Sequence, residues 1–191
     1  SGYGFFKRPN ESYHKIDIIR VPIIPRGQAS GIRLALNYFS FVLGSFFAAP
    51  YIIKKNFDVV FVFEVSPITV CLPAIFIKKI KKIPICLWVL DLWPESITAA
   101  SRIKSKKIVR LVTPLVKYIY QKTDKILVSS KGFIDSIKHK GIKEEKIQFF
   151  PQWAEVVFEN PPKNNENILT NLRNDSFKIT FAGNIGVSQD F

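Results

Sequence analysis

The segment Asp91–Glu95 (DLWPE) places two carboxylates, a tryptophan and a proline directly after an apolar run. A carboxylate in such a place could orient or deprotonate a sugar hydroxyl, and Trp93 could form an apolar wall beside a sugar ring. A structural role fits the same residues. Glu95 would then cap a helix beginning near Ser96, while Asp91 would accept backbone hydrogen bonds and Trp93 would lie in the core. The spacing alone leaves both interpretations open.

Two further segments could hold an anion. The run 129–132 (SSKG) lies between a strand-like run and a helical segment, where hydroxyl and amide groups can bind phosphate, although ordinary N-capping is the alternative. Gly183 and Gly186 flank Asn184 after another strand-like run, and glycines there let a diphosphate approach the backbone amides. The pattern is neither the dinucleotide fingerprint nor a P-loop.

The sequence does not indicate a metal site or a catalytic triad. His14 and His139 are far apart, and neither has a histidine or cysteine at ligand spacing, so no metal site is predicted. No G-x-S-x-G motif is present, so a hydrolase triad is not indicated. Cys71 and Cys86 lie inside apolar runs and are expected to be reduced and buried, which excludes a disulfide framework.

Alternating strands and helices must position these residues. Strands are predicted at 15–25, 58–63, 84–90, 124–129 and 147–150. Helices are predicted at 32–53, 68–80, 105–122 and 131–140. This alternation indicates an α/β fold with a parallel sheet, in which ligands bind beyond the carboxyl ends of the strands. The expected site therefore includes Val65–Pro67 besides the two segments near 91 and 129. Pro114 should kink its helix unless that helix begins nearer Thr113.

The chain carries 28 basic and 15 acidic residues, a formal net charge of +13. Such an excess indicates nucleic acid, an anionic membrane surface or phosphorylated ligands, although a lysine-rich solvated surface is the simpler explanation. Arginines are few and most aromatic residues fall inside apolar runs, which argues against nucleic acid. An anionic membrane surface fits better.

The apolar segment Ile32–Ile53 is long enough to cross a membrane. Arg33, Asn37 and Pro50 argue against spanning. We therefore expect a long, largely buried helix with one side available to lipid.

The chain contains no methionine and begins with Ser1. A natural reading frame begins with methionine, and no signal-peptide pattern occupies the start. The sequence is therefore expected to be a fragment cut at both ends. The polar stretch 159–176, with two adjacent prolines and several asparagines, indicates a linker between two domains.

Four segments together resemble family 4 glycosyltransferases. They occur in that family's order, cover most of the chain, and are similar to the bacterial surface-polysaccharide branch that includes L-fucosamine transferases. The segments are WVLDLWPESI (88–97), TDKILVSSKGF (123–133), GIKEEKI with PQWAE (141–155) and FAGNIGVSQDF (181–191).

The resemblance implies a GT-B fold, in which two Rossmann-like domains face each other across a cleft. Residues 1–158 would form the acceptor-side domain, a Rossmann-like parallel sheet with helices on both faces that lacks its first strand. Residues 159–176 would be the linker, and residues 177–191 would begin the donor-binding domain with its first strand.

The resemblance also assigns roles to residues. Asp91 falls where many family members carry an acceptor-side catalytic residue, often histidine. Gly183, Asn184 and Gly186 match the loop that binds the donor diphosphate. The acceptor cleft is expected to include Ser66, Trp93, Glu95, Ser130 and Lys131.

The implied activity is a retaining, metal-independent transfer of a sugar, such as an N-acetyl amino sugar, from a UDP-linked donor. The implied acceptor is a polyprenyl-diphosphate-linked saccharide in O-antigen, lipopolysaccharide or capsule synthesis. No cofactor and no nucleic acid are expected, and the place of action would be the cytoplasmic face of the bacterial plasma membrane, as a peripheral protein. The family's donor-binding Glu-x7-Glu motif is absent from the chain, so this piece alone is expected to be inactive. The alternative is a non-catalytic, basic membrane-surface binding module.

Overall fold

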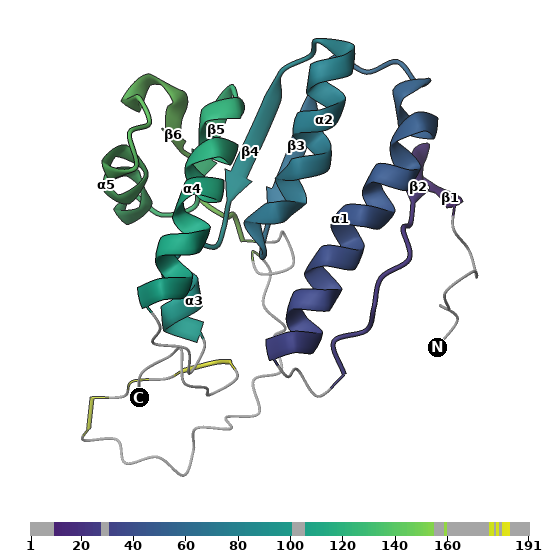
Figure 1. Ribbon diagram of the computed structural model, residues 1–191. Coiled ribbons are helices and arrows are strands. Elements are labelled where there is room, and N and C mark those ends of the chain that lie inside the picture. Colours follow the sequence, from purple (N-terminus) through teal and green to yellow (C-terminus); the bar gives the residue numbers. More distant parts are fainter. Residues whose placement is uncertain are drawn as a thin grey trace.

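The computed structural model describes residues 10–27, 31–100, 106–154, 159, 176, 177, 179 and 181–183. At its centre lies a four-stranded sheet in the order β3-β4-β5-β6, with every neighbouring pair parallel (Figure 1). The strands are β3 (Val60–Glu64), β4 (Ile85–Val89), β5 (Lys125–Val128) and β6 (Ile147–Phe149). The predicted α/β, Rossmann-like arrangement is confirmed.

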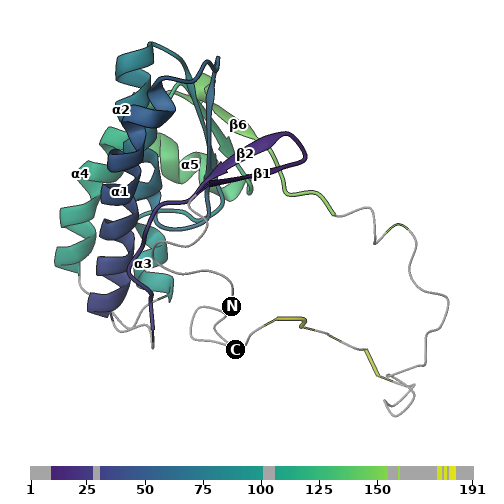
Figure 2. The same ribbon diagram turned by 90° about the vertical axis from the view of Figure 1, so that its right-hand side faces the viewer.

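Helices connect and cover these strands. Figure 2 shows that α1, α2 and α4 lie side by side on one face of the sheet. The helices are α1 (Gly31–Ile53), α2 (Cys71–Lys81), α3 (Glu95–Ala100), α4 (Lys106–Lys122) and α5 (Gly132–His139), with 3-10 turns η1 (Ile68–Val70) and η2 (Glu144–Lys146).

The core lies between the sheet and these helices. Along β3 the residues alternate, so that Val62 and Glu64 are buried while Phe61 and Phe63 are about half exposed. The apolar stripe predicted for α4 packs against the sheet, and Tyr120 on that stripe is fully buried. Cys71 is buried, Cys86 is half-buried and both are free thiols.

The expected strand at 15–25 is wrong in extent and in partner. Only β2 (Ile16–Ile19) is a strand, and it pairs antiparallel with β1 (Asn10–Tyr13) in a hairpin outside the parallel sheet. His14 and Lys15 make the turn with positive φ values of 47° and 67°, as a tight hairpin requires. The prolines that follow β2 restrict further pairing.

Helix α4 runs through Pro114 from a start at Lys106, so a start near Thr113 is wrong. Proline lacks the N–H group that would bond to the Arg110 carbonyl one turn back. The preceding Thr113 hydroxyl donates to the Val109 carbonyl at 2.7 Å. Packing of the stripe against the sheet keeps the helix continuous across this position.

Helix α1 differs from the expectation of a largely buried helix. It is the helix within the described ranges that is long and apolar enough to cross a membrane, and 22% of its most apolar window is buried. Its contact with the domain is nonetheless specific. The Asn37 amide donates to the Ile24 carbonyl at 2.6 Å, and the Ser40 hydroxyl accepts from the Ile24 N–H at 2.9 Å.

The proposed linker and second domain fall mostly outside the described residues. Of the predicted strand at 177–182, the described positions 177, 179, 181 and 182 adopt no regular structure. The domain boundaries therefore stay a prediction.

Candidate functional site

The carboxyl ends of β3, β4 and β5 bring three sequence-predicted segments to one edge of the sheet. The Leu90 N–H donates to the Glu64 carbonyl at 3.0 Å, which joins the end of β3 to the end of β4. The Ser129 N–H donates to the Val89 carbonyl at 3.2 Å, which joins β4 to β5. Parallel pairing thus gathers the predicted segments 65–67, 91–95 and 129–132 at one edge of the sheet.

Glu64 is the most perturbed acid in the described part of the chain. Its side chain is fully buried, and neither carboxylate oxygen has a hydrogen-bond partner among the described residues. Burial, and then the negative charge of Asp91, raise the pKa of Glu64 to about 9. The backbone N–H groups of Asp91 and Leu90 lie near enough to oppose the rise, although neither reaches hydrogen-bond geometry. Glu64 is therefore a neutral acid at pH 7.

Asp91 is half-buried, and its charge is near enough to raise the pKa of Glu64. Its charge also contributes to the raised pKa of the Tyr120 hydroxyl, although burial and Glu64 contribute first. Asp91 is thus electrostatically coupled to two buried groups that titrate far from their ordinary ranges. Such coupling is typical of functional sites, although ion-pair networks in the protein interior produce it too.

Four further polar side-chain atoms are buried and have no hydrogen-bond partner in the described structure. They are Thr69 Oγ1, Trp93 Nε1, Ser96 Oγ and the Tyr120 hydroxyl. Folded proteins satisfy the great majority of such atoms. Thr69 follows β3, and Trp93 and Ser96 follow β4, so three of the four residues come after the strands whose carboxyl ends form this edge of the sheet.

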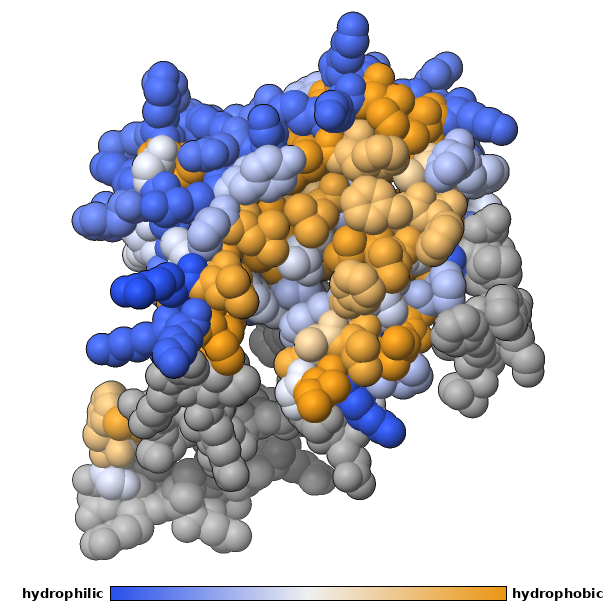
Figure 3. All heavy atoms as spheres, viewed as in Figure 1, coloured by the Kyte–Doolittle hydropathy of each residue, from blue (hydrophilic) through white to orange (hydrophobic). Residues whose placement is uncertain are grey.

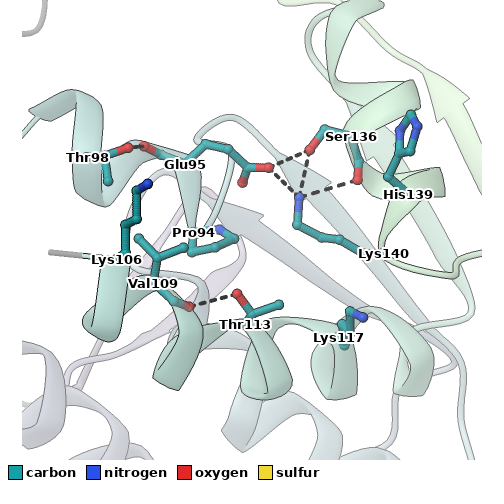
Figure 4. A pocket seen from close by; sticks show the side chains of 10 residues that line it. All are labelled: Pro94, Glu95, Thr98, Lys106, Val109, Thr113, Lys117, Ser136, His139 and Lys140. Atoms are coloured by element: carbon teal, nitrogen blue, oxygen red, sulfur yellow. Dashed lines mark hydrogen bonds and ion pairs between the residues drawn. The ribbon is translucent and has the colours of Figure 1, made fainter. Parts of the chain in front are cut away.

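Glu95 begins α3 and reaches across to α5 (Figure 4). Its carboxylate accepts hydrogen bonds from the Ser136 hydroxyl and the Lys140 ammonium, each at 2.6 Å. Burial would raise the pKa of Glu95, but these two donors outweigh it and lower the pKa. The Lys140 side chain is 9% exposed, so this ion pair fixes α5 against the start of α3.

A groove of about 680 Å³ opens beside this ion pair, between α3, α4 and α5 (Figure 4). Three lysines and three hydroxyl residues lie around it, although most of its exposed lining is apolar. It is lined by Pro94, Glu95, Thr98, Lys106, Val109, Thr113, Lys117, Ser136, His139 and Lys140.

The other predicted acceptor residues have local roles in the structure. Trp93 packs against the core, and the Ser130 hydroxyl accepts from the Gly132 N–H at 3.3 Å at the start of α5. The Lys131 ammonium lies 5.4 Å from the centre of the Phe149 ring, a cation–π contact. Ser66 is half-buried. These contacts match the structural alternatives, and a role in ligand binding stays a prediction.

The predicted diphosphate loop falls mostly outside the described residues. Gly183 is described, with the Phe181 ring beside it, whereas Asn184 and Gly186 lie outside the described residues. No group of three or more potential metal ligands occurs in the part of the chain that the structure describes.

Sequence reasoning missed Glu64 and the partnership of Glu95 with Lys140. A signal for Glu64 was present, because it ends the run VFVFE and shares the parity of Val60 and Val62, the residues facing the helices. No local signal pairs Glu95 with Lys140, which is 45 residues away.

Comparison with known proteins agrees with the resemblance in part. No family model matches the chain. The chain is 24% identical over 178 residues to a protein of Escherichia coli (strain K12) described as "Putative colanic acid biosynthesis glycosyl transferase WcaI". The match covers 89% of this chain but 43% of that protein, so the chain spans less than half of its relative. The similarity supports a glycosyltransferase, and the α/β sheet described above is consistent with the amino-terminal half of a GT-B enzyme.

Proposed function

We propose that the chain is the acceptor-side part of a glycosyltransferase that acts in the synthesis of a cell-surface polysaccharide. The observation that carries this proposal is the coupling of Asp91 to the neutral, buried Glu64 at the carboxyl ends of β3 and β4. That edge of a parallel α/β sheet is where such folds bind ligands. The similarity to a glycosyltransferase along 89% of the chain supplies the reaction class.

In the proposed reaction Asp91, at the carboxyl end of β4, orients or deprotonates the acceptor hydroxyl. The lysine-lined groove next to Glu95 would accommodate a charged part of the acceptor. The donor would bind to residues beyond the described part of the chain, with Gly183, Asn184 and Gly186 contacting its diphosphate.

The finer proposals follow the resemblance to family 4, including its fucosamine-transferase branch. They are retention of configuration, a UDP-linked amino sugar as donor, and a polyprenyl-diphosphate-linked saccharide of an O-antigen or capsule as acceptor. The reaction would need no metal and no other cofactor, and the protein would lie at the cytoplasmic face of the plasma membrane.

The test measures sugar transfer from radiolabelled nucleotide sugars to a lipid-linked saccharide acceptor extracted from membranes. It uses the protein that contains this chain together with its flanking sequence. We expect Asp91→Asn to lower turnover by about a hundredfold or more, the usual contribution of a general base. Asp135→Asn is the matched control, because Asp135 lies on α5 outside the groove lining and should leave turnover unchanged. Unchanged transfer in Asp91→Asn would remove Asp91 from the mechanism.

A non-catalytic membrane-binding module is the competing proposal. The similarity to a glycosyltransferase does not favour it. Donor hydrolysis or transfer that depends on Asp91 would exclude it, whereas vesicle binding with no activity towards any donor would support it.

A further inference from the structure

The outer face of α1 is apolar along its length, and the rest of the domain leaves it uncovered. Its residues recur at intervals of three or four, which puts them on one side of the helix. They are Ile32 (77% exposed), Leu36 (44%), Phe39 (60%), Leu43 (41%), Phe47 (85%) and Tyr51 (51%). Together they form what we call the α1 face.

The α1 face continues onto the neighbouring helices. Phe46 of α1 contacts Phe76 of α2 edge to face, with ring centres 5.3 Å apart, and Phe76 and Ile80 of α2 are themselves partly exposed. Figure 3 shows the result as a broad hydrophobic surface over α1 and α2. A contiguous patch of this kind marks an interaction site.

Basic residues border this surface where α1 and α2 end. Lys54 follows the last residue of α1, while Lys79 and Lys82 lie at the end of α2, and all three are exposed. None of the three has an ion-pair partner in the described ranges. In Figure 3 hydrophilic residues border the hydrophobic surface along its upper rim. An apolar centre with a cationic border is complementary to an anionic lipid surface.

The opposite side of α1 is engaged in the domain. Asn37 donates to the Ile24 carbonyl and accepts from the Arg26 guanidinium at 3.1 Å, while Val42 and Ala49 are buried. A helix held in this way on one side cannot be surrounded by lipid without breaking those contacts. Contact with lipid is therefore limited to the outer face, which favours a helix lying in the plane of the interface.

We propose that the α1 face docks this domain onto an anionic lipid bilayer, with α1 lying in the interface and Lys54, Lys79 and Lys82 contacting lipid headgroups. This inference extends the proposed location at the membrane and does not depend on sugar transfer. It places one specific helix against the lipid, which orients the whole sheet relative to the membrane.

The test is co-sedimentation of the chain with phosphatidylcholine vesicles, with and without phosphatidylglycerol, in the absence of any sugar donor. We expect the chain to bind the anionic vesicles, and we expect high salt to weaken this binding. Phe39→Glu combined with Phe47→Glu should weaken it by about a hundredfold or more, because two exposed aromatic side chains no longer enter the interface. Ile16→Glu, an equally exposed apolar position on the β1–β2 hairpin, is the matched control and should bind as the parent does.

Replacing Lys54, Lys79 and Lys82 with glutamine should weaken binding to anionic vesicles by about a hundredfold, at about fivefold per basic residue, and leave neutral vesicles unaffected. Circular dichroism of each variant separates loss of binding from loss of folding. Three outcomes would overturn the proposal. The chain could bind vesicles independently of salt and resist alkaline extraction, as a spanning helix does, or the Phe39/Phe47 variant could bind vesicles as well as the parent. Alternatively, the parent could bind no vesicles and form a dimer in light scattering that is lost in the Phe39/Phe47 variant. Because no donor is present, failure here leaves the proposed sugar transfer untouched.

Discussion

Replacing Glu64 with glutamine should make the protein more stable at neutral pH, because it removes a buried acid that resists ionisation. The ordinary pKa of a glutamate is 4.5, and that of Glu64 in the folded protein is about 9. Between these values the unfolded chain has released the proton that the folded chain retains. Stability therefore falls as pH rises through this window, and the full contribution of the neutral acid is present only below about pH 4.5.

The magnitude follows from the size of the shift. Each pKa unit corresponds to about 1.4 kcal/mol, so at pH 7 the ionisation of Glu64 in the unfolded chain costs about 3 kcal/mol of stability. Glutamine has nearly the same shape, remains neutral and leaves the neighbouring side chains in place. Glu64→Gln should therefore match the parent near pH 4.5 and exceed its free energy of unfolding by about 3 kcal/mol at pH 7.

Urea unfolding, followed through the fluorescence of the three tryptophans over a pH series from about 5 to 8.5, measures this difference. The informative quantity is its slope against pH, because a change in packing would add a constant offset. Asp58→Asn is the matched control, since Asp58 is exposed and precedes the same strand, and it should give no such slope. A difference between parent and Glu64→Gln that stays flat across the series would refute the assignment of Glu64 as a buried neutral acid.

Two further predictions concern the neighbouring contacts. Glu95→Gln should destabilise the protein by about 1–2 kcal/mol, because Lys140 is nearly buried while its partner is half exposed. A double-mutant cycle with Lys140→Met, read by urea unfolding, should return a coupling energy that stabilises the pair. Strictly additive effects of the two substitutions on the free energy of unfolding would contradict this prediction. Tyr120→Phe should leave stability unchanged or raise it by about 1 kcal/mol, since it removes a buried hydroxyl that has no partner in the described structure. A loss of stability in thermal unfolding would show that this hydroxyl is satisfied.

The parallel sheet was predictable because continuous apolar runs of strand length leave a plain signature in the sequence, even for β3, whose Phe61 and Phe63 stay about half exposed. The apolar runs of β3, β4 and β5 and the stripe of α4 define where each element lies, and their alternation defines parallel pairing. The hairpin was not predictable in the same way, because β1 (NESY) has no apolar alternation and is held through its pairing with β2. Its register depends on the turn at His14 and Lys15 rather than on burial.

The candidate site was predictable in position but less so in its contacts. The rule that ligands bind beyond the strand ends located the segments near Asp91 and Ser130 from sequence order alone. Which side chains face one another there depends on the helices packed over the sheet, and these contacts are long-range. The partner of Glu95 lies on α5, and the acid beneath Asp91 comes from β3. The sequence therefore indicated the location, while the charge state of the site required the structure.

The lysines that give the chain its basic excess fall into two groups in the structure. Several lysines bind carbonyl groups at helix ends, where a cation complements the helix dipole. Lys81 donates to the Ile53 carbonyl at 2.8 Å at the end of α1, and Lys146 donates to the Gln121 carbonyl at 3.0 Å near the end of α4. These ammonium groups stabilise the fold and are already occupied. They keep their positive charge, so the net charge of +13 is unchanged, but their hydrogen-bond donors are in use. Direct contacts to a polyanionic partner would come from exposed lysines such as Lys79, which has no ion pair in the described chain.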